Sequence, residues 1–236
     1  MTKPVKLVLS AGVFACALSG FATSSRADWP MPRQNPRRTA VASGTSNIQQ
    51  PVAFWRHFAG GTISSTQALL VDVDGSGGGE VIMCTGGKVV AKRASDNQTV
   101  WSNADTSCVE LIAVVDLDGD GKSELVTRST GQVYVLELSS GKVQWAEPAG
   151  EMGTIGAVRI DNLDGDPRPE MVIQECGCCS VNSGNSGYGY KFGGAGATLS
   201  KPLKMWEMPP VTCGANRATA ITHLRATTTS EVVFSN

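Results

Sequence analysis

The sequence has little charge of either sign and no long apolar run that could cross a membrane. Its 20 Lys and Arg residues against 21 Asp and Glu residues give a net charge of −1, and 17% of the 236 residues are charged. Nucleic-acid binding needs a basic stripe or patch, so nucleic acid is not expected as a partner. No run approaches the roughly 20 apolar residues of a membrane-spanning helix, so no membrane span is expected.

Catalytic motifs are also missing. His57 and His223 are the only histidines, and there is no Gly-x-Ser-x-Gly, no His-Glu-x-x-His and no Gly-x-Gly-x-x-Gly opening a helix. His57 stands close to a tryptophan and His223 lies in a degenerate loop, so both are expected to be structural or exposed. The acidic residues are accounted for by the metal loops described below. An enzyme is therefore not ruled out but is disfavoured.

Long stretches with a 3.6-residue apolar period are absent as well, whereas glycine is abundant at 27 residues. Many short strands joined by tight turns are the default interpretation of such a chain. The expected fold class is all-β.

The most informative feature is a nine-residue pattern that occurs three times, at residues 72–80, 116–124 and 162–170. Side chains with oxygen atoms stand at positions 1, 3, 5 and 9 of each copy, with glycines or prolines between them. A hard cation with several oxygen ligands suits this arrangement. Apolar runs flank every copy, so each is expected to be a hairpin turn that holds a metal ion. Turn propensity alone would not require an acid at position 9.

Two other motifs share part of this pattern. An EF-hand needs a bidentate Glu at position 12 and a helix on each side, but position 12 of the second copy is Thr127 in an expected strand. Residues 121–123 imitate the end of a phosphate-binding P-loop, whose first glycine would have to stand at Asp116. Neither motif fits.

The loops belong to a longer repeat. They recur at spacings of 44 and 46 residues, and Trp55, Trp101 and Trp145 recur in step at 46 and 44. In the second unit we expect strands at about 111–115, 124–128, 132–138 and 143–146, and four such antiparallel strands form one propeller blade. The prediction is a partial β-propeller of four-stranded antiparallel blades over residues 51–236, with about three full blades and parts of others: about 67–103, 111–147, 156–208 and a partial blade at 218–236.

The third and fourth units deviate. Glu170 and Trp206 are 36 residues apart against 21 in the other units, which places a 15-residue insertion around residues 176–187. The fourth copy, residues 223–231, keeps Glu231 but has His, Arg and Thr at positions 1, 3 and 5, so no metal is expected there. Because the Trp55 strand has no inner strands before it, the expectation is the N-terminal part of a larger propeller, or a truncated product.

The first 27 residues are predicted to be a secretory signal peptide. Lys3 and Lys6 precede an apolar segment at 7–18, and residues 25–27 form a small-x-small cleavage site. An N-terminal arm, 28–50, would follow. Lipid attachment at Cys16 is the alternative, although Phe14 is bulky for such a site. A secreted, periplasmic or cell-surface location is expected.

Six cysteines remain after the signal segment, and an even number in an exported chain indicates disulfides. Their places in the repeat favour a bond between Cys84 and Cys108, and one from Cys176 or Cys178 to Cys213. A zinc site at residues 176–179 is the rival, but the spacing lacks the usual paired knuckles. Two or three disulfides are expected.

The loop pattern Asp-x-Asp-Gly-Asp-Gly-x-x-Glu between strands resembles the FG-GAP (VCBS-type) repeats of integrin-α-like β-propellers. In that family the side chains at positions 1, 3, 5 and 9 and the carbonyl at position 7 bind calcium. The resemblance implies three ligand sets: Asp72, Asp74, Ser76, the Gly78 carbonyl and Glu80; Asp116, Asp118, Asp120, the Lys122 carbonyl and Glu124; Asn162, Asp164, Asp166, the Arg168 carbonyl and Glu170. Ser76, Asn162 and the prolines at 167 and 169 depart from the pattern, so the middle site is expected to bind most tightly.

Residues 135–145 look like the tryptophan-docking motif of quinoprotein-type propellers, and residues 28–31 resemble the start of many exported propellers of that kind. Glu137 and Arg93 stand where the motif has Asp. The resemblance implies that Trp101 and Trp145 pack between blades.

The leading functional hypothesis is an extracytoplasmic calcium-binding propeller that acts as a binding, adhesion or interaction module for an unknown protein or carbohydrate. Two alternatives stay open: the N-terminal part of a propeller polysaccharide lyase or other secreted enzyme, and an envelope assembly scaffold.

Overall fold

The computed structural model describes residues 66–149, 154–175, 184–194 and 196–212, the strands at 219–222 and 231–234, the segment 29–33 and isolated positions between 39 and 63. In this part of the chain every regular element is a β-strand, which confirms the all-β class. No helix in the described residues is long and apolar enough to cross a membrane. Several predictions concern residues outside the description: the signal peptide, Trp55, both histidines and the cysteines at 16, 176, 178, 179 and 213.

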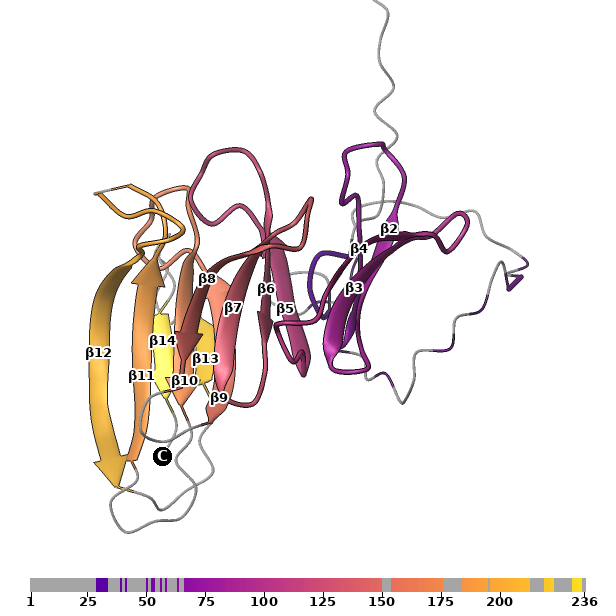
Figure 1. Cartoon of the computed structure of the whole chain (residues 1–236). Coiled ribbons are helices and arrows are strands. Elements are labelled where there is room, and N and C mark those ends of the chain that lie inside the picture. Colours follow the sequence, from indigo (N-terminus) through magenta and orange to yellow (C-terminus); the bar gives the residue numbers. More distant parts are fainter. Residues whose placement is uncertain are drawn as a thin grey trace, which may run out of the picture.

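The strands form four consecutive antiparallel sheets (Figure 1). The first three have four strands each, in sequence order, and the last has two. The first sheet contains β1 (Ala68–Val71), β2 (Glu80–Thr85), β3 (Lys88–Arg93) and β4 (Thr99–Asn103); the second contains β5 (Glu110–Val115), β6 (Glu124–Arg128), β7 (Gln132–Glu137) and β8 (Val143–Pro148); the third contains β9 (Ile155–Asp161), β10 (Glu170–Glu175), β11 (Gly184–Lys191) and β12 (Leu203–Thr212); β13 (Thr219–Thr222) pairs with β14 (Glu231–Phe234). The strands predicted for the second unit agree with β5 to β8 within two residues at each end.

The first strands of successive sheets lie next to one another. Strand β5 contacts both β1 and β9, and β9 also contacts β13. Each of the first three sheets is therefore a four-stranded meander whose first strand lies beside the first strand of the next sheet. This is the arrangement of propeller blades around an axis, and it confirms the prediction of partial propeller blades.

The second sheet lies between the first and the third and is buried on both faces (Figure 1). Leu125 and Leu136 belong to the core shared with the first sheet, whereas Val126 and Val135 belong to the core shared with the third. Because successive side chains of a strand point to opposite faces, a strand buried on both sides must be apolar at consecutive positions. This explains the unbroken apolar runs beside the loops.

Two tryptophans join neighbouring sheets, as the docking motif implied. The Trp101 ring lies against Gly141 of the second sheet, where a Cβ atom would come within 2.5 Å of the ring. The Trp145 ring meets Tyr190 and Phe192 of the third sheet edge-on, with centroids 5.2 and 5.1 Å apart. The prediction that both tryptophans pack between blades is confirmed.

A segment near the N-terminus crosses the first strands of two sheets. The backbone N–H of Trp29 donates to the carbonyl of Leu70 at 2.9 Å, and the carbonyl of Pro30 accepts from the N–H of Val114 at 2.7 Å. These residues were expected to belong to an N-terminal arm and to resemble the start of exported propellers, but no contact with the sheets was predicted. The contacts are made by backbone atoms, so no side-chain pattern announces them.

The insertion of the third unit falls between β10 and β11 and also lengthens the strands. Strand β11 starts at Gly184, so the end of the predicted insertion is strand. Strand β12, with 10 residues, is twice as long as β4, with 5. The extra chain therefore extends one edge of the third sheet.

Candidate metal-binding loops

Each predicted loop is the turn between the first and second strands of a sheet, in one common register. The residue before position 1 pairs across the turn with the glutamate at position 9: Val71 with Glu80, Val115 with Glu124, Asp161 with Glu170, and Thr222 with Glu231. The expectation that the loops are hairpin turns is confirmed for the three complete copies. In the fourth, the strands on either side are present and residues 223–230 lie outside the description.

The terminal glutamates of the three described loops are buried. Glu80 and Glu170 are fully buried, and Glu124 is 3% exposed. One carboxylate oxygen of each accepts a hydrogen bond from the backbone N–H at loop position 2, over distances of 2.8, 2.9 and 2.7 Å in the three loops. This bond fixes the carboxylate at the base of the turn.

The glutamate meets two aspartates in each loop. Carboxylate oxygens within 4.8 Å of one another come from three groups of residues: Asp72, Asp74 and Glu80; Asp116, Asp118 and Glu124; Asp164, Asp166 and Glu170. Backbone N–H groups hold the aspartates in place, as when Gly119 and Gly121 donate to the Asp116 carboxylate at 2.7 and 2.9 Å. Both glycines have positive φ, of 80° and 86°, a conformation that residues with a Cβ rarely adopt.

The other predicted ligands lie outside these groups. The Ser76 hydroxyl accepts from the N–H of Gly78 at 3.1 Å, and the Asp120 carboxylate accepts from the N–H of Lys122 at 2.8 Å. The side-chain amide of Asn162 donates to the carbonyl of Asp166. These three ligands, and the carbonyls of Gly78, Lys122 and Arg168, stay predictions.

In the first loop two carboxylate oxygens lack a partner. Among the described residues no hydrogen-bond donor reaches Oε1 of Glu80 or Oδ1 of Asp72, and both atoms are buried. A buried carboxylate oxygen without a donor is unfavourable unless a cation lies near it. The donor set of this loop therefore fits a cation with oxygen ligands.

The pKa of the terminal glutamate in the second loop also indicates that a cation would be favourable there. Burial raises the pKa of Glu124 to about 7, and the nearby Asp118 and Asp116 carboxylates add to this, although the N–H of Leu117 acts in the opposite direction. Burial is also the main reason for the raised pKa values of Glu80 and Glu170. A cation among these carboxylates would favour the ionised form.

The third loop already contains a side-chain cation. Nζ of Lys191 lies 2.6 Å from Oδ2 of Asp166 and 3.4 Å from Oε1 of Glu170, and it donates a further hydrogen bond to Asp164. The hydrogen bond from Lys191 is the main reason that the pKa of Asp166 is far below its usual range. The sequence patterns did not single out Lys191, which stands at the end of β11 and far from the loop along the chain.

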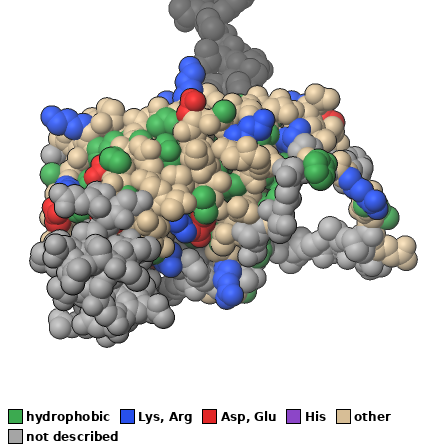
Figure 2. Space-filling model, turned by 60° about the horizontal axis from the view of Figure 1, so that its bottom comes forward, with side chains coloured by type: hydrophobic (Ala, Val, Ile, Leu, Met, Phe, Trp, Pro, Cys, Tyr) green, Lys and Arg blue, Asp and Glu red, His purple; other side chains and the backbone are tan. Residues whose placement is uncertain are grey.

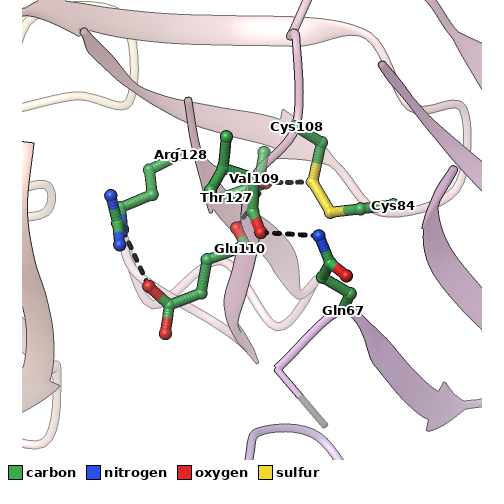
Figure 3. The surroundings of a disulfide bond; sticks show 7 residues. All are labelled: Gln67, Cys84, Cys108, Val109, Glu110, Thr127 and Arg128. Carbon is green, nitrogen blue, oxygen red and sulfur yellow. Dashed lines mark hydrogen bonds and ion pairs between the residues drawn. A yellow bond between two sulfur atoms is a disulfide. The ribbon is translucent and has the colours of Figure 1, made fainter. Parts of the chain in front are cut away.

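A disulfide joins the first sheet to the start of the second (Figure 3). Cys84 lies in β2 and Cys108 just before β5, with Cα atoms 5.4 Å apart. Nearby, Gln67 donates to the carbonyl of Val109 at 3.0 Å. The predicted Cys84–Cys108 bond is confirmed, and the second predicted pair lies outside the described residues.

Charged side chains are dispersed on the visible surface. Figure 2 shows Lys and Arg side chains scattered over one face of the molecule, without a continuous basic stripe.

The consecutive four-stranded meanders, each with a turn that gathers carboxylates, define a chain of the β-propeller class. Residues 110–136, from the start of β5 into β7, match the family model of the FG-GAP repeat. This match confirms the resemblance seen in the loop pattern, and it covers the middle of the three loops.

The chain was also compared with curated proteins and with solved structures. No curated protein matches the chain. Among solved structures the chain is similar to "Crystal structure of BBS1N in complex with ARL6DN, soaked with lead", with a TM-score of 0.38 and 8% identity over 57% of this chain and 53% of that chain. The chain thus spans about half the length of that structure, and a likeness at this level says nothing about function.

Proposed function

We propose that this chain is an extracytoplasmic propeller-type interaction module, and that its first and second loops each bind one calcium ion. The ligands are Asp72, Asp74, Ser76, the Gly78 carbonyl and Glu80 in the first loop, and Asp116, Asp118, Asp120, the Lys122 carbonyl and Glu124 in the second. The observation that carries this proposal is the convergence of two aspartates on a buried glutamate in each turn.

Electrostatics supports a bound cation in both loops. Three carboxylates with oxygens within 4.8 Å of one another repel strongly, most of all where burial limits screening by water. Two basic side chains near the loops pair with other aspartates: Arg93 pairs with Asp96 at 3.0 Å, and Lys122, whose side chain is 80% exposed, lies 3.5 Å from Asp120. Burial still raises the pKa of Glu80, although the charge of Arg93 acts in the opposite direction.

Calcium suits these loops better than magnesium. Calcium accepts six to eight oxygen ligands at longer distances, whereas magnesium needs a near-octahedral set at short distances. A glycine-rich turn with carboxylates, a carbonyl and a terminal glutamate supplies many oxygens in flexible geometry. When bound, the ion would offset two of the negative charges of the turn and so stabilise the hairpin formed by the first two strands of the first and the second sheet.

The loops at the ends of the sheets support the binding role, and the disulfide supports the location. Propeller-type sheets present loops at their ends for a partner, here a protein or a carbohydrate. The Cys84–Cys108 disulfide supports an oxidising compartment, as expected of an exported protein.

Thermal unfolding in millimolar calcium and in chelator tests the proposal. The melting temperature should rise with calcium, and Asp118→Asn should remove part of this rise because it deletes a ligand of the middle loop. Asp105→Asn is the matched control, because Asp105 is exposed and lies outside the loops. An equal calcium response in both variants would contradict the proposal.

A further inference from the structure

We propose that the ammonium group of Lys191 takes the place of calcium in the third loop, so that the third sheet keeps its turn without a metal ion. The proposal rests on the proposed function only for the identity of the ion in the first two loops. The occupant of the third loop is argued from its own residues.

The ammonium group lies within reach of all three carboxylates that would otherwise be ligands. It donates hydrogen bonds to Asp164 and Asp166 and makes an ion pair with Oε1 of Glu170. That oxygen has no hydrogen-bond donor, as at the equivalent oxygen of Glu80, but here a cation stands 3.4 Å away. The Lys191 side chain is 10% exposed, so the group is enclosed by the loop.

One cross-strand position distinguishes the three loops. In the first two sheets the residue opposite the terminal glutamate on the third strand is Arg93 or Glu137. In the third sheet Met171 pairs with Tyr190, so the next position along places Lys191 opposite Glu170. Side chains of directly opposed residues lie on the same face of a sheet, which explains why Lys191 reaches a loop 21 positions away in sequence.

The three side chains at this position behave differently. Arg93 turns to Asp96, and the carboxylate of Glu137 accepts a hydrogen bond from Ser140. Lys191 instead points into its loop. Among the described residues, the terminal glutamate has a lysine or arginine ion-pair partner only in the third loop.

A second positive group adds to this compensation. The guanidinium of Arg168 donates to Oδ2 of Asp166 at 2.9 Å, the same oxygen that Lys191 contacts. With position 1 also reduced to the amide of Asn162, the loop has three carboxylates and two cations. Calcium would have to displace a buried ammonium group that has three carboxylate partners, so the loop should prefer Lys191 at millimolar calcium.

Chemical footprinting tests this occupancy directly. Acetylation of lysines in the full chain, read by mass spectrometry, should leave Lys191 at least tenfold less reactive than the exposed Lys122, equally in chelator and in calcium. Reactivity of Lys191 that is high in chelator, or that increases on addition of calcium, would overturn the proposal.

Calcium stoichiometry gives a second test that separates this proposal from the proposed function. Asp164→Asn should leave the number of bound ions unchanged, whereas Asp118→Asn should lower it by one. Loss of an ion in Asp164→Asn would overturn the lysine assignment and leave calcium binding intact. If the parent bound no calcium, the proposed function would fail and the footprint in chelator would still decide the role of Lys191.

Replacement of Lys191 by an uncharged residue gives a third test, because the third loop should then respond to calcium. Lys191→Met should melt below the parent in chelator and should gain a calcium-dependent rise in melting temperature, because only Arg168 then remains to offset the three carboxylates of the third loop. Arg93→Met is the matched control, since Arg93 occupies the same register position but pairs outside its loop. The control should melt within about a degree of the parent in chelator. If Lys191→Met does the same, the proposal is contradicted.

Discussion

The indole N–H of Trp101 donates a hydrogen bond to the backbone carbonyl of Leu138 at 2.9 Å, across the junction of the first and second sheets. The side chain of Asn103, two residues further along β4, donates to the carbonyl of Gly141 at 2.7 Å. The turn between β7 and β8 is thus held by two side chains of the preceding sheet.

Gly141→Ala should destabilise this junction. A methyl group there would come within 2.5 Å of the Trp101 ring, and the φ of 70° is unfavourable for alanine. We expect a loss of roughly 2 to 4 kcal/mol in the free energy of unfolding, measured with denaturant, because a close clash adds to the backbone strain.

Gly196→Ala separates the two causes. Gly196 has a φ of 84°, but no described atom lies within 4 Å of the position of its Cβ. This variant should lose only the backbone contribution, about 1 kcal/mol. Equal losses at the two positions would show that the Trp101 contact has no role.

The pH dependence of stability should reveal Glu124. Its pKa in the folded chain without metal is about 7, above the ordinary value of 4.5. A raised folded pKa favours the protonated form, so its stabilising contribution is complete below about pH 4.5 and is lost as the pH rises through 7. The contribution is at most on the order of 3 kcal/mol.

Denaturant unfolding in chelator at pH 5 and pH 8 measures this effect. The parent should lose more stability over this interval than Glu124→Gln, in which position 124 does not titrate. With calcium present the direction reverses for this group, because the ion binds the carboxylate, and calcium affinity should fall below about pH 7. The same pH slope in parent and variant would exclude Glu124 as the titrating group.

The disulfide should contribute to stability through its closed loop. Cys84 and Cys108 are 24 residues apart in sequence, and closing a loop of this length is worth about 3 kcal/mol in the chain-entropy description. The double variant Cys84→Ala with Cys108→Ala should lose about this amount in denaturant unfolding. Thr127→Ser, which keeps a hydroxyl beside Cys108, is the control for local disturbance. A double variant as stable as the parent would contradict this role.

The features that repeat along the chain could be predicted from the sequence. Contacts that depend on how one particular pair of segments aligns could not. The recurrence of loops and tryptophans defined the blades, the hairpin turns and the Cys84–Cys108 pair, because each is encoded by local spacing that repeats. Lys191 was missed because its place opposite Glu170 depends on the register in which β11 pairs with β10 after the insertion, and the spacing of the repeat does not give that register. The pairing of Trp29 with Leu70 was missed because it is made by backbone atoms.

The central claim is tested most directly by titrating calcium into chelator-treated protein, with isothermal titration calorimetry and native mass spectrometry as the two readouts. The account predicts two bound ions per chain with dissociation constants of about 10⁻³ M or tighter, the range of extracellular calcium modules. The tighter ion should be lost in Asp118→Asn, because the middle loop has four carboxylates among its proposed ligands and the first has three. Absence of calcium binding at millimolar concentration, or binding that persists unchanged in Asp118→Asn and Asp74→Asn, would contradict it.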